Sequence, residues 1–160
     1  MILCEVNVLL HAHKEGSPAH GVLRPWLLDA LNDDDVPFGV SDLMLSAMIR
    51  IATNRRVFDP PSTQAEALAF AEAIRDADNA VPVRPGRRHW DLFTRMCVEA
   101  GAAANLVPNA YLAALAVEHG CEWTTTDRGF ARFPGLRWRN PLAGHVAGQM
   151  VGQVVDRVVG

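Results

Sequence analysis

Four polar side chains stand where an alternation of strands and helices would gather them. Glu5 ends an apolar run at the N-terminus, Asp42 follows the run VPFGV, and Asp127 follows the segment TTT. Asn109 opens a helix of small apolar residues that leads toward the TTT segment. Carboxylate and amide oxygens suit Mg2+, which keeps several waters and therefore needs few protein ligands. By spacing alone, however, a strand-end acid is more often a helix cap or a loop residue.

The elements that would position these groups follow from the pattern of apolar residues. We expect strands at 1–6, 36–40, 80–85, 124–126 and 136–138, and helices at 7–14, 17–31, 42–53, 63–77, 86–101 and from Pro108 onward. Asn7 and either Ser41 or Asp42 are candidate N-caps, and Gly101 closes a helix. Strands separated by helices need crossovers, which predicts an α/β fold with a mainly parallel central sheet flanked by helices. The carboxyl ends of such strands share one edge, where the four polar groups would meet.

The composition is that of one globular domain. The chain has 160 residues, 49% of them apolar, which suffices for a core and excludes disorder of the whole. No apolar run is long enough to span a membrane. The N-terminal apolar segment contains Glu5 and lacks a basic leader, so it does not read as a signal peptide. Three cysteines without CxxC spacing indicate a reduced, cytoplasmic protein with neither a disulfide framework nor a zinc site.

The cations are almost all arginine, although the net charge is only -3. They gather at Arg50, Arg55 and Arg56, at Arg84, Arg87 and Arg88, and at Arg128 and Arg132. A guanidinium group can donate two parallel hydrogen bonds to a phosphate, which makes these groups candidate contacts to nucleic acid. Charge alone leaves an ordinary solvated surface as the more frequent explanation.

Four separated stretches occur in the order that is typical of one protein family. They are MILCEVNVLLHAH (1–13), MIRIATNRRVF (48–58), RPGRRHW (84–90) and NLVPNAYLAALAVEHGCEWTTTDRGFARFPGLRWRNPL (105–142). Together they resemble VapC-type toxins of toxin–antitoxin pairs, a PIN-domain subfamily of the kind abundant in mycobacteria. The resemblance covers residues 1–142 as one PIN-like domain. It leaves 143–160 as a C-terminal tail, either loosely ordered or a packing arm.

The resemblance implies a PIN-like three-layer sandwich and an endoribonuclease that depends on Mg2+ or Mn2+. It also implies a VapB-like antitoxin that silences the toxin, an RNA substrate such as tRNA or ribosomal RNA, and a homodimer, with no membrane partner. The candidate contacts to RNA or antitoxin are then Arg50, Arg55, Arg56, Arg87, Arg88 and Arg128. Arg128 or a neighbour would position the RNA backbone.

The same resemblance assigns a metal pocket, and this chain departs from it. Glu5 matches the first acid, where the family pattern has Asp. Asp127 matches the acid of the T-x-D-x-x-F motif. Asn109 stands where the family has a third acid. A further family acid would fall at Ala47, and Asp42 is a candidate substitute for it.

These departures predict a weakened site. Asn109 keeps the shape of an acid but loses its charge, and Glu5 is one methylene longer than Asp, which moves its oxygens. Mg2+ tolerates such displacement poorly. Either the site is naturally weak or these positions were altered to disarm a toxin. The leading hypothesis is a metal-dependent endoribonuclease, the alternative is a catalytically silent PIN-like module that binds RNA or antitoxin, and a structural subunit is the third.

Other residues that could do chemistry have plainer explanations. His11 and His13 lie on opposite sides of a short helix, which predicts one surface and one half-buried side chain. The four tryptophans could stack on bases, but their apolar neighbours predict packing for at least three. The run 33–35 is predicted to be a solvated loop. Asn7 is either a helix cap or a residue that orients the site.

Overall fold

A computed structural model describes residues 1–143 as an α/β domain built on one five-stranded sheet. The strands are β1 (Ile2–Cys4), β2 (Phe38–Val40), β3 (Ala80–Pro82), β4 (Glu122–Thr124) and β5 (Trp138–Arg139). Their order is β3-β2-β1-β4-β5, and every neighbouring pair is parallel, which confirms the predicted parallel sheet. The chain winds outward from β1 through β2 to β3 and then returns to β4 on the other side. Sheets of this kind bind ligands at such a reversal, beside the carboxyl ends of the strands.

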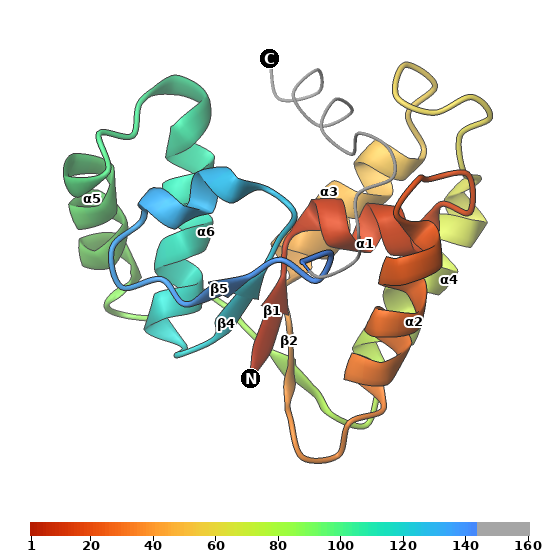
Figure 1. The fold of residues 1–160 in the computed structure, drawn as a ribbon, viewed down its shortest axis with the longest axis horizontal. Coiled ribbons are helices and arrows are strands. Elements are labelled where there is room, and N and C mark those ends of the chain that lie inside the picture. Colours follow the sequence, from red (N-terminus) through yellow and green to blue (C-terminus); the bar gives the residue numbers. More distant parts are fainter. Residues whose placement is uncertain (144–160) are drawn as a thin grey trace.

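Six helices flank the sheet and complete a three-layer sandwich (Figure 1). They are α1 (Val6–His13), α2 (His20–Leu31), α3 (Asp42–Ala52), α4 (Gln64–Arg75), α5 (His89–Glu99) and α6 (Val107–Glu118), with short 3-10 helices η1 (Ala104–Leu106) and η2 (Arg128–Arg132). In Figure 1, α5 and α6 lie to the left of the strands, and α2 and α4 lie to the right. Residues 144–160 of the predicted tail lie outside the described residues.

Local sequence explains several of the helix boundaries. Thr63 caps α4 through a capping box, because its hydroxyl accepts the Glu66 amide at 3.2 Å and Glu66 Oε2 accepts the Thr63 amide at 2.7 Å. Gly101 follows α5 at a φ of 59°, a left-handed conformation that glycine adopts without strain. The helix predicted from residue 17 begins at His20 instead, after a turn that contains Ser17.

Two predicted boundaries near the sheet are wrong. Asn7 is not the cap of α1, because the helix already begins at Val6 and Glu5 occupies the N-cap position. The strand that was expected to run to Asp127 ends at Thr124. The chain leaves the sheet after Thr124 and turns into η2, which Asp127 caps by accepting a hydrogen bond from a backbone amide. Both acids therefore follow their strands rather than lie in them.

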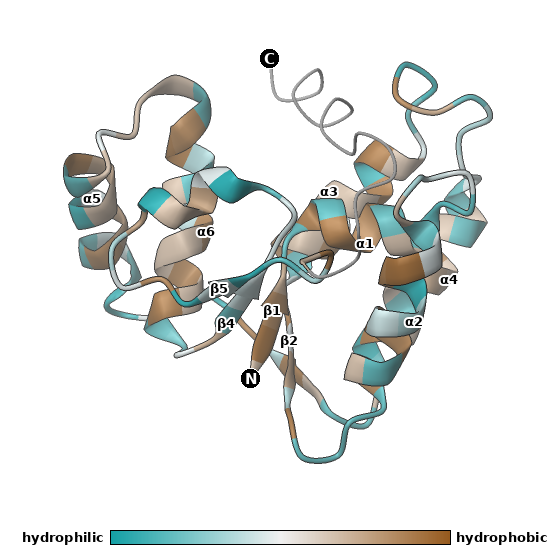
Figure 2. Ribbon diagram, in the orientation of Figure 1, coloured by the Kyte–Doolittle hydropathy of each residue, from teal (hydrophilic) through white to brown (hydrophobic). Residues whose placement is uncertain are grey.

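The core lies on both faces of the sheet (Figure 2). Trp123 on β4 is fully buried, and its ring centroid is 5.2 Å from that of Phe130. Trp26 and Trp138 are half-buried against this core, whereas Trp90 is 67% exposed. The prediction that at least three tryptophans are packing residues is confirmed.

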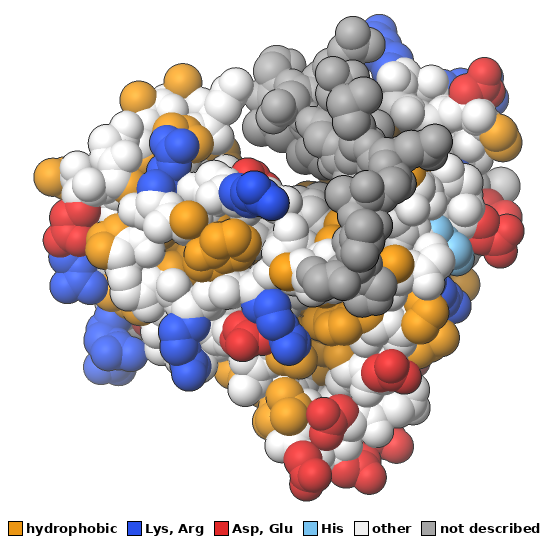
Figure 3. All heavy atoms as spheres, viewed as in Figure 1, with side chains coloured by type: hydrophobic (Ala, Val, Ile, Leu, Met, Phe, Trp, Pro, Cys, Tyr) orange, Lys and Arg blue, Asp and Glu red, His pale blue; other side chains and the backbone are white. Residues whose placement is uncertain are grey.

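The acidic loop that follows α2 lies on the surface of the domain. Residues 33–35, which follow α2, are exposed as predicted, and acidic side chains gather over this loop at the lower tip of Figure 3. Within residues 1–143, no helix combines the length and apolar character that crossing a membrane requires.

Candidate functional site

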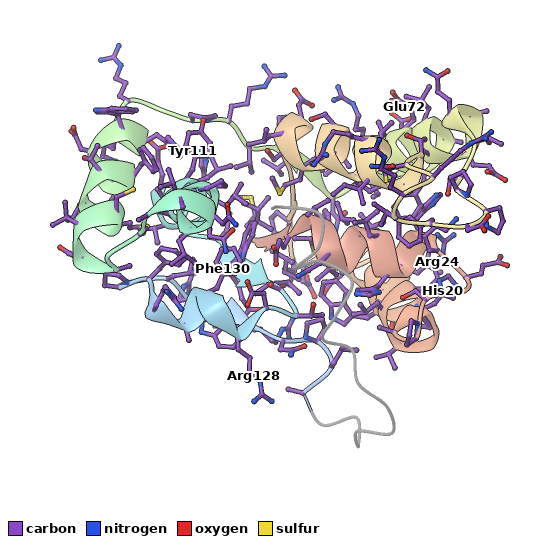
Figure 4. The ribbon with its side chains drawn as sticks, turned by 90° about the horizontal axis from the view of Figure 1, so that it is seen from above. His20, Arg24, Glu72, Tyr111, Arg128 and Phe130 are labelled. Atoms are coloured by element: carbon purple, nitrogen blue, oxygen red, sulfur yellow. The ribbon has the colours of Figure 1, made fainter. Side chains whose placement is uncertain are left out.

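A cleft of about 1410 Å³ opens beside the carboxyl end of β1, at the point where the winding of the sheet reverses. Glu5, Asn7 and Asn109 line it. In Figure 4, Tyr111 on α6 and Arg24 on α2 lie on opposite sides of the molecule, and both line this cleft. The cleft therefore separates the α5–α6 side of the domain from the α1–α4 side.

The pairing of β1 with β4 brings Glu5 and Thr125 together. Cys4 lies opposite Thr124 in the register, and the Glu5 amide donates to the Thr124 carbonyl oxygen at 2.9 Å. The residues that follow the two strands are therefore neighbours. The Thr125 hydroxyl donates a hydrogen bond to Glu5 Oε2, and Thr125 Oγ1 accepts one from the Asp127 amide at 2.9 Å. Thr125 thus connects the two acids of the site.

Asn7 fixes the Glu5 carboxyl group from the first turn of α1. Asn7 Nδ2 donates to Glu5 Oε2 at 2.7 Å and lies 3.5 Å from Thr125 Oγ1. Asn7 Oδ1 is buried and has no hydrogen-bond partner among the residues the structure describes. Of the two roles predicted for Asn7, the structure therefore supports the orienting one.

Asp127 is an exposed acid that is not itself among the residues lining the cleft, and its carboxylate is held by the backbone that follows it. Its Oδ1 accepts a hydrogen bond from the Gly129 amide at 2.6 Å. A Cβ atom at Gly129 would lie 2.9 Å from this oxygen, so the close approach depends on glycine. Together with the bond from its own amide to Thr125, this contact fixes Asp127 close to the buried Glu5.

The remaining candidate acids are not grouped with this pair. Asn109 and Ala47 line the cleft from α6 and α3, so two positions at which the resemblance places acids present an amide and a methyl group. Asp42 does not line the cleft. It forms ion pairs with Arg75 and, at 3.3 Å, with Arg84. The structure therefore places Asp42 in a separate surface cluster rather than in the position of the missing acid.

This donor set suits Mg2+ only in part. Glu5 and Asp127 supply two carboxyl groups, whereas Asn109 supplies a neutral oxygen. In the part of the chain from 1 to 143, no three His, Cys, Asp or Glu side chains are grouped so that they could hold a metal ion. Because Mg2+ demands near-ideal octahedral oxygen ligands, the residues present form a poorer site than a cluster of carboxylates would.

The Glu5 carboxyl group is only partly ionised near neutral pH. Burial raises its pKa from 4.5 to about 7, and the Asp127 carboxylate adds to the rise. Hydrogen bonds from Thr125 and Asn7 to the carboxylate lower the pKa but do not offset the burial. A metal ligand with this pKa binds a cation in competition with a proton.

The raised pKa of Glu5 predicts a pH-dependent cost in stability. Glu5 ionises near pH 4.5 in the unfolded chain and near pH 7 in the folded chain. Its favourable contribution to the free energy of unfolding is therefore fully present below pH 4.5 and is lost as the pH rises to about 7. Glu5→Gln removes this loss. Without metal, we expect the stability of the variant relative to the unchanged chain to increase by about 3 kcal/mol between pH 4.5 and pH 8.

Urea unfolding in EDTA at the two pH values measures this difference. Glu99→Gln, at the exposed end of α5, is the matched control and should show no comparable pH dependence. An equal effect of Glu5→Gln on stability at both pH values would show that burial does not raise the pKa of Glu5.

The prediction of one surface and one half-buried histidine on α1 is wrong. Both His11 and His13 are half-buried and line the cleft. His11 Nδ1 contacts Ser17 Oγ, and His13 Nε2 lies 2.9 Å from Ser62 Oγ. Lys14 Nζ also donates to Ser62 Oγ, at 3.2 Å. The segment before α4 folds back onto the end of α1, a long-range contact for which the sequence carried no signal.

The candidate RNA-contacting arginines Arg50, Arg55, Arg56, Arg87, Arg88 and Arg128 are all exposed. Of these, Arg50 lines the cleft, on the last turn of α3. Arg88 instead donates to the Glu118 carbonyl oxygen at 3.1 Å. Arg128 projects outward from η2 (Figure 4). Sequence reasoning missed the aromatic residues of the cleft, among them Phe93 and Tyr111.

The sequence matches known proteins along nearly the whole described domain. The PIN domain family matches residues 2–136. The chain is 45% identical over 141 residues to Ribonuclease VapC31 of Mycobacterium tuberculosis (strain CDC 1551 / Oshkosh), which covers 88% of this chain and 99% of that protein. It is 42% identical over 144 residues to VapC ribonuclease Mb2897 of Mycobacterium bovis, which covers 90% and 97%.

Solved structures share the fold at much lower identity. VapBC2 from Rickettsia felis, bound to a DNA fragment from the promoter, matches with a TM-score of 0.61 at 12% identity and covers 88% of this chain and 98% of that chain. FitAcB from Neisseria gonorrhoeae matches with a TM-score of 0.59 at 16% identity and covers 89% and 99%. The PIN-like fold is thereby confirmed. From the family match and the curated relatives, this chain belongs to the VapC family of PIN-domain proteins.

Proposed function

We propose that this chain is the toxin of a toxin–antitoxin pair, an endoribonuclease that cuts RNA in the cleft beside β1. The observation that carries the proposal is the pair of hydrogen bonds that Thr125 makes at the reversal point of the sheet. One goes to the Glu5 carboxyl group, and the other comes from the Asp127 amide. Relatives named ribonucleases, at 42% and 45% identity, support it.

The residues in the cleft and beside it have different roles in this proposal. Glu5 and Asp127 are the acids that would hold Mg2+ or Mn2+, with Asn109 as a neutral third ligand. The chemistry that such an ion supplies when bound is activation of water and stabilisation of the leaving oxygen of a phosphodiester. Asn7 and Thr125 orient the Glu5 carboxyl group through their hydrogen bonds. Hydrogen bonds that orient a metal ligand in this way commonly contribute ~10- to 100-fold to metal affinity or activity.

The unchanged chain is proposed to be a slow enzyme. Asn109 removes one negative charge from the cleft, and the pKa of about 7 leaves Glu5 partly protonated at neutral pH. The second candidate function is a catalytically silent module that binds RNA or antitoxin through the same cleft. The neutral Asn109 and the absence of a three-acid group within residues 1–143 favour it.

The proposed partners follow from membership of the VapC family. A VapB-like antitoxin would cover the cleft, and an Arg side chain from it could pair with Glu5 and Asp127 in place of the metal ion. The RNA would be bound at a single-stranded loop, as in tRNA or ribosomal RNA, because unstacked bases are accessible to side chains. A homodimer is part of the same proposal.

Sequencing of RNA ends from cells tests this function. Cells that express the variant Glu5→Asp with Asn109→Asp should accumulate new RNA ends at a small number of sites. Co-expression of the small protein encoded next to this chain should suppress them, and Asp127→Ala should abolish them. Unchanged RNA ends in cells that contain folded double variant would overturn the ribonuclease proposal and favour the silent module.

A further inference from the structure

A row of three aromatic rings borders the cleft on the side of α5 and α6. The ring centroids of Trp90 and Phe93 are 5.5 Å apart, and those of Phe93 and Tyr111 are 5.7 Å apart. Phe93 and Tyr111 line the cleft, and Trp90 extends the row to the solvent. Asn109 lines the same cleft two residues before Tyr111 on α6. This row, here termed the aromatic wall, therefore leads to the surface from the cleft that Glu5 and Asn109 line, here termed the acid pocket.

The aromatic wall is held in place by buried contacts beneath it. The ring of the buried His89 meets Tyr111 edge-on, with centroids 4.3 Å apart. The Glu118 carboxylate on α6 accepts the amides of Gly86 at 2.9 Å and Arg88 at 3.0 Å, just before α5 begins. A Cβ atom at Gly86 would lie 2.6 Å from Glu118 Oε1. The start of α5 is thus fixed to α6, and a wall that is already ordered loses little entropy when it binds a ligand.

Trp90 is unlike the other tryptophans of the chain. Trp123 is fully buried, and Trp26 and Trp138 are half-buried, whereas Trp90 is 67% exposed and contributes little to the core. A large exposed aromatic ring next to a cleft is typical of a binding surface.

Cations accompany the aromatic wall. Arg84, Arg87 and Arg88 precede α5, where Arg84 also pairs with Asp42 and Arg88 donates to the Glu118 carbonyl oxygen. Lys14, Arg24 and Arg50 line the opposite side of the cleft. Rings flanked by cations suit single-stranded RNA, because bases stack on the rings while phosphates pair with the cations. Four acids, Glu5, Glu15, Asp59 and Glu66, line the same cleft. The aromatic rings rather than a positive net charge therefore distinguish this surface.

We propose that the aromatic wall binds an unstacked base of single-stranded RNA next to the acid pocket, with Trp90 as the outermost stacking ring. This inference rests on the proposed function, because it takes RNA as the ligand. It requires neither bound metal nor cleavage. A planar base can stack on an exposed ring whatever its identity, so the wall would set where the RNA lies rather than which base is read.

Binding of a fluorescently labelled single-stranded oligouridine to the full chain in EDTA tests the inference. Trp90→Ala and Phe93→Leu should each weaken binding about 5- to 100-fold. Trp90→Phe keeps a ring and should retain most of the affinity. Val98→Ala, at an exposed position of α5 outside the cleft, is the matched control and should bind as the unchanged chain does. The dependence of affinity on salt should stay the same in Trp90→Ala, because phosphate contacts set it.

Three other outcomes would each contradict the inference, and they differ in whether the proposed function also fails. If the unchanged chain binds RNA and Trp90→Ala and Phe93→Leu bind equally well, the aromatic wall is not a base-binding site, while the proposed function stands. If the folded, unchanged chain does not bind RNA even at low salt, the proposed function fails and the inference fails with it. If light scattering shows that Trp90→Ala splits a dimer, and the loss of affinity follows the loss of the dimer, the wall is a protein interface.

Discussion

The double variant Glu5→Asp with Asn109→Asp is expected to cleave RNA about 10- to 100-fold faster than the unchanged chain. Asn109→Asp adds a full negative charge to the cleft, on the first turn of α6. In the unchanged chain, Glu5 is buried and its Oε2 accepts hydrogen bonds from Asn7 and Thr125. Glu5→Asp shortens this side chain by one methylene group. Asn109→Asp adds a carboxylate and Glu5→Asp gives the shorter acid, each at a position where the resemblance to VapC-type toxins places Asp.

The measurement is the initial rate on a single-stranded RNA with Mg2+ or Mn2+, with EDTA as the blank. Asp127→Ala in the double variant should return the rate to the background. It removes the Asp127 carboxylate but keeps the backbone amide that donates to Thr125. Because the two altered side chains would act on one ion, their effects need not multiply. Equal rates in the unchanged chain and the folded double variant would show that positions 5 and 109 do not form the metal site.

Thr125→Val is expected to lower the free energy of unfolding by about 1–3 kcal/mol, while the neighbouring Thr124→Val costs little or nothing. Both side chains are fully buried. The Thr125 hydroxyl donates to Glu5 and accepts the Asp127 amide, and valine would leave both groups without this partner. The Thr124 hydroxyl has no hydrogen-bond partner among the described residues, so valine removes a buried polar group that is already unsatisfied.

Urea unfolding of the two variants at pH 7 makes the comparison, because the substitutions are identical in chemistry and adjacent in sequence. In the Glu5→Asp, Asn109→Asp background, Thr125→Val should also slow RNA cleavage by about 10-fold, since it removes the hydroxyl that orients the acid at position 5 and holds the Asp127 amide. Similar destabilisation by Thr124→Val and Thr125→Val would mean that the Thr125 bonds to Glu5 and Asp127 contribute no more than packing.

The parallel sheet and the succession of helices could be predicted from the sequence, because short apolar runs alternate with amphipathic segments. The boundaries beside the site could not be predicted as well. Three consecutive threonines precede Asp127, and nothing in the sequence indicates that the strand ends at the first of them. The Thr125 amide still donates to the Arg139 carbonyl oxygen of β5 at 3.0 Å, while the Thr125 hydroxyl donates to Glu5, so the site begins directly where the strand ends.

The alternation of strands and helices predicted that Glu5, Asp42, Asp127 and Asn109 meet at one edge of the sheet, but it could not assign them to a metal pocket. The resemblance identified Glu5, Asn109 and Asp127, and the register between β1 and β4 explains why the first and last of these lie close together. Asp42 was close in sequence to the missing acid, but Arg75 and Arg84 hold it outside the cleft. The aromatic wall could not be recognised, because it depends on the packing of α5 against α6.

Calorimetric titration with Mn2+ of the unchanged chain beside Asn109→Asp tests the incomplete metal site most directly. Both proteins keep Glu5 and Asp127, and the difference is one charge on α6. The unchanged chain should bind Mn2+ weakly, and Asn109→Asp should bind it at least about 10-fold more tightly, with Asp127→Ala removing the gain. Equal Mn2+ affinity in the unchanged chain and the folded Asn109→Asp variant would contradict a metal site at Glu5, Asn109 and Asp127.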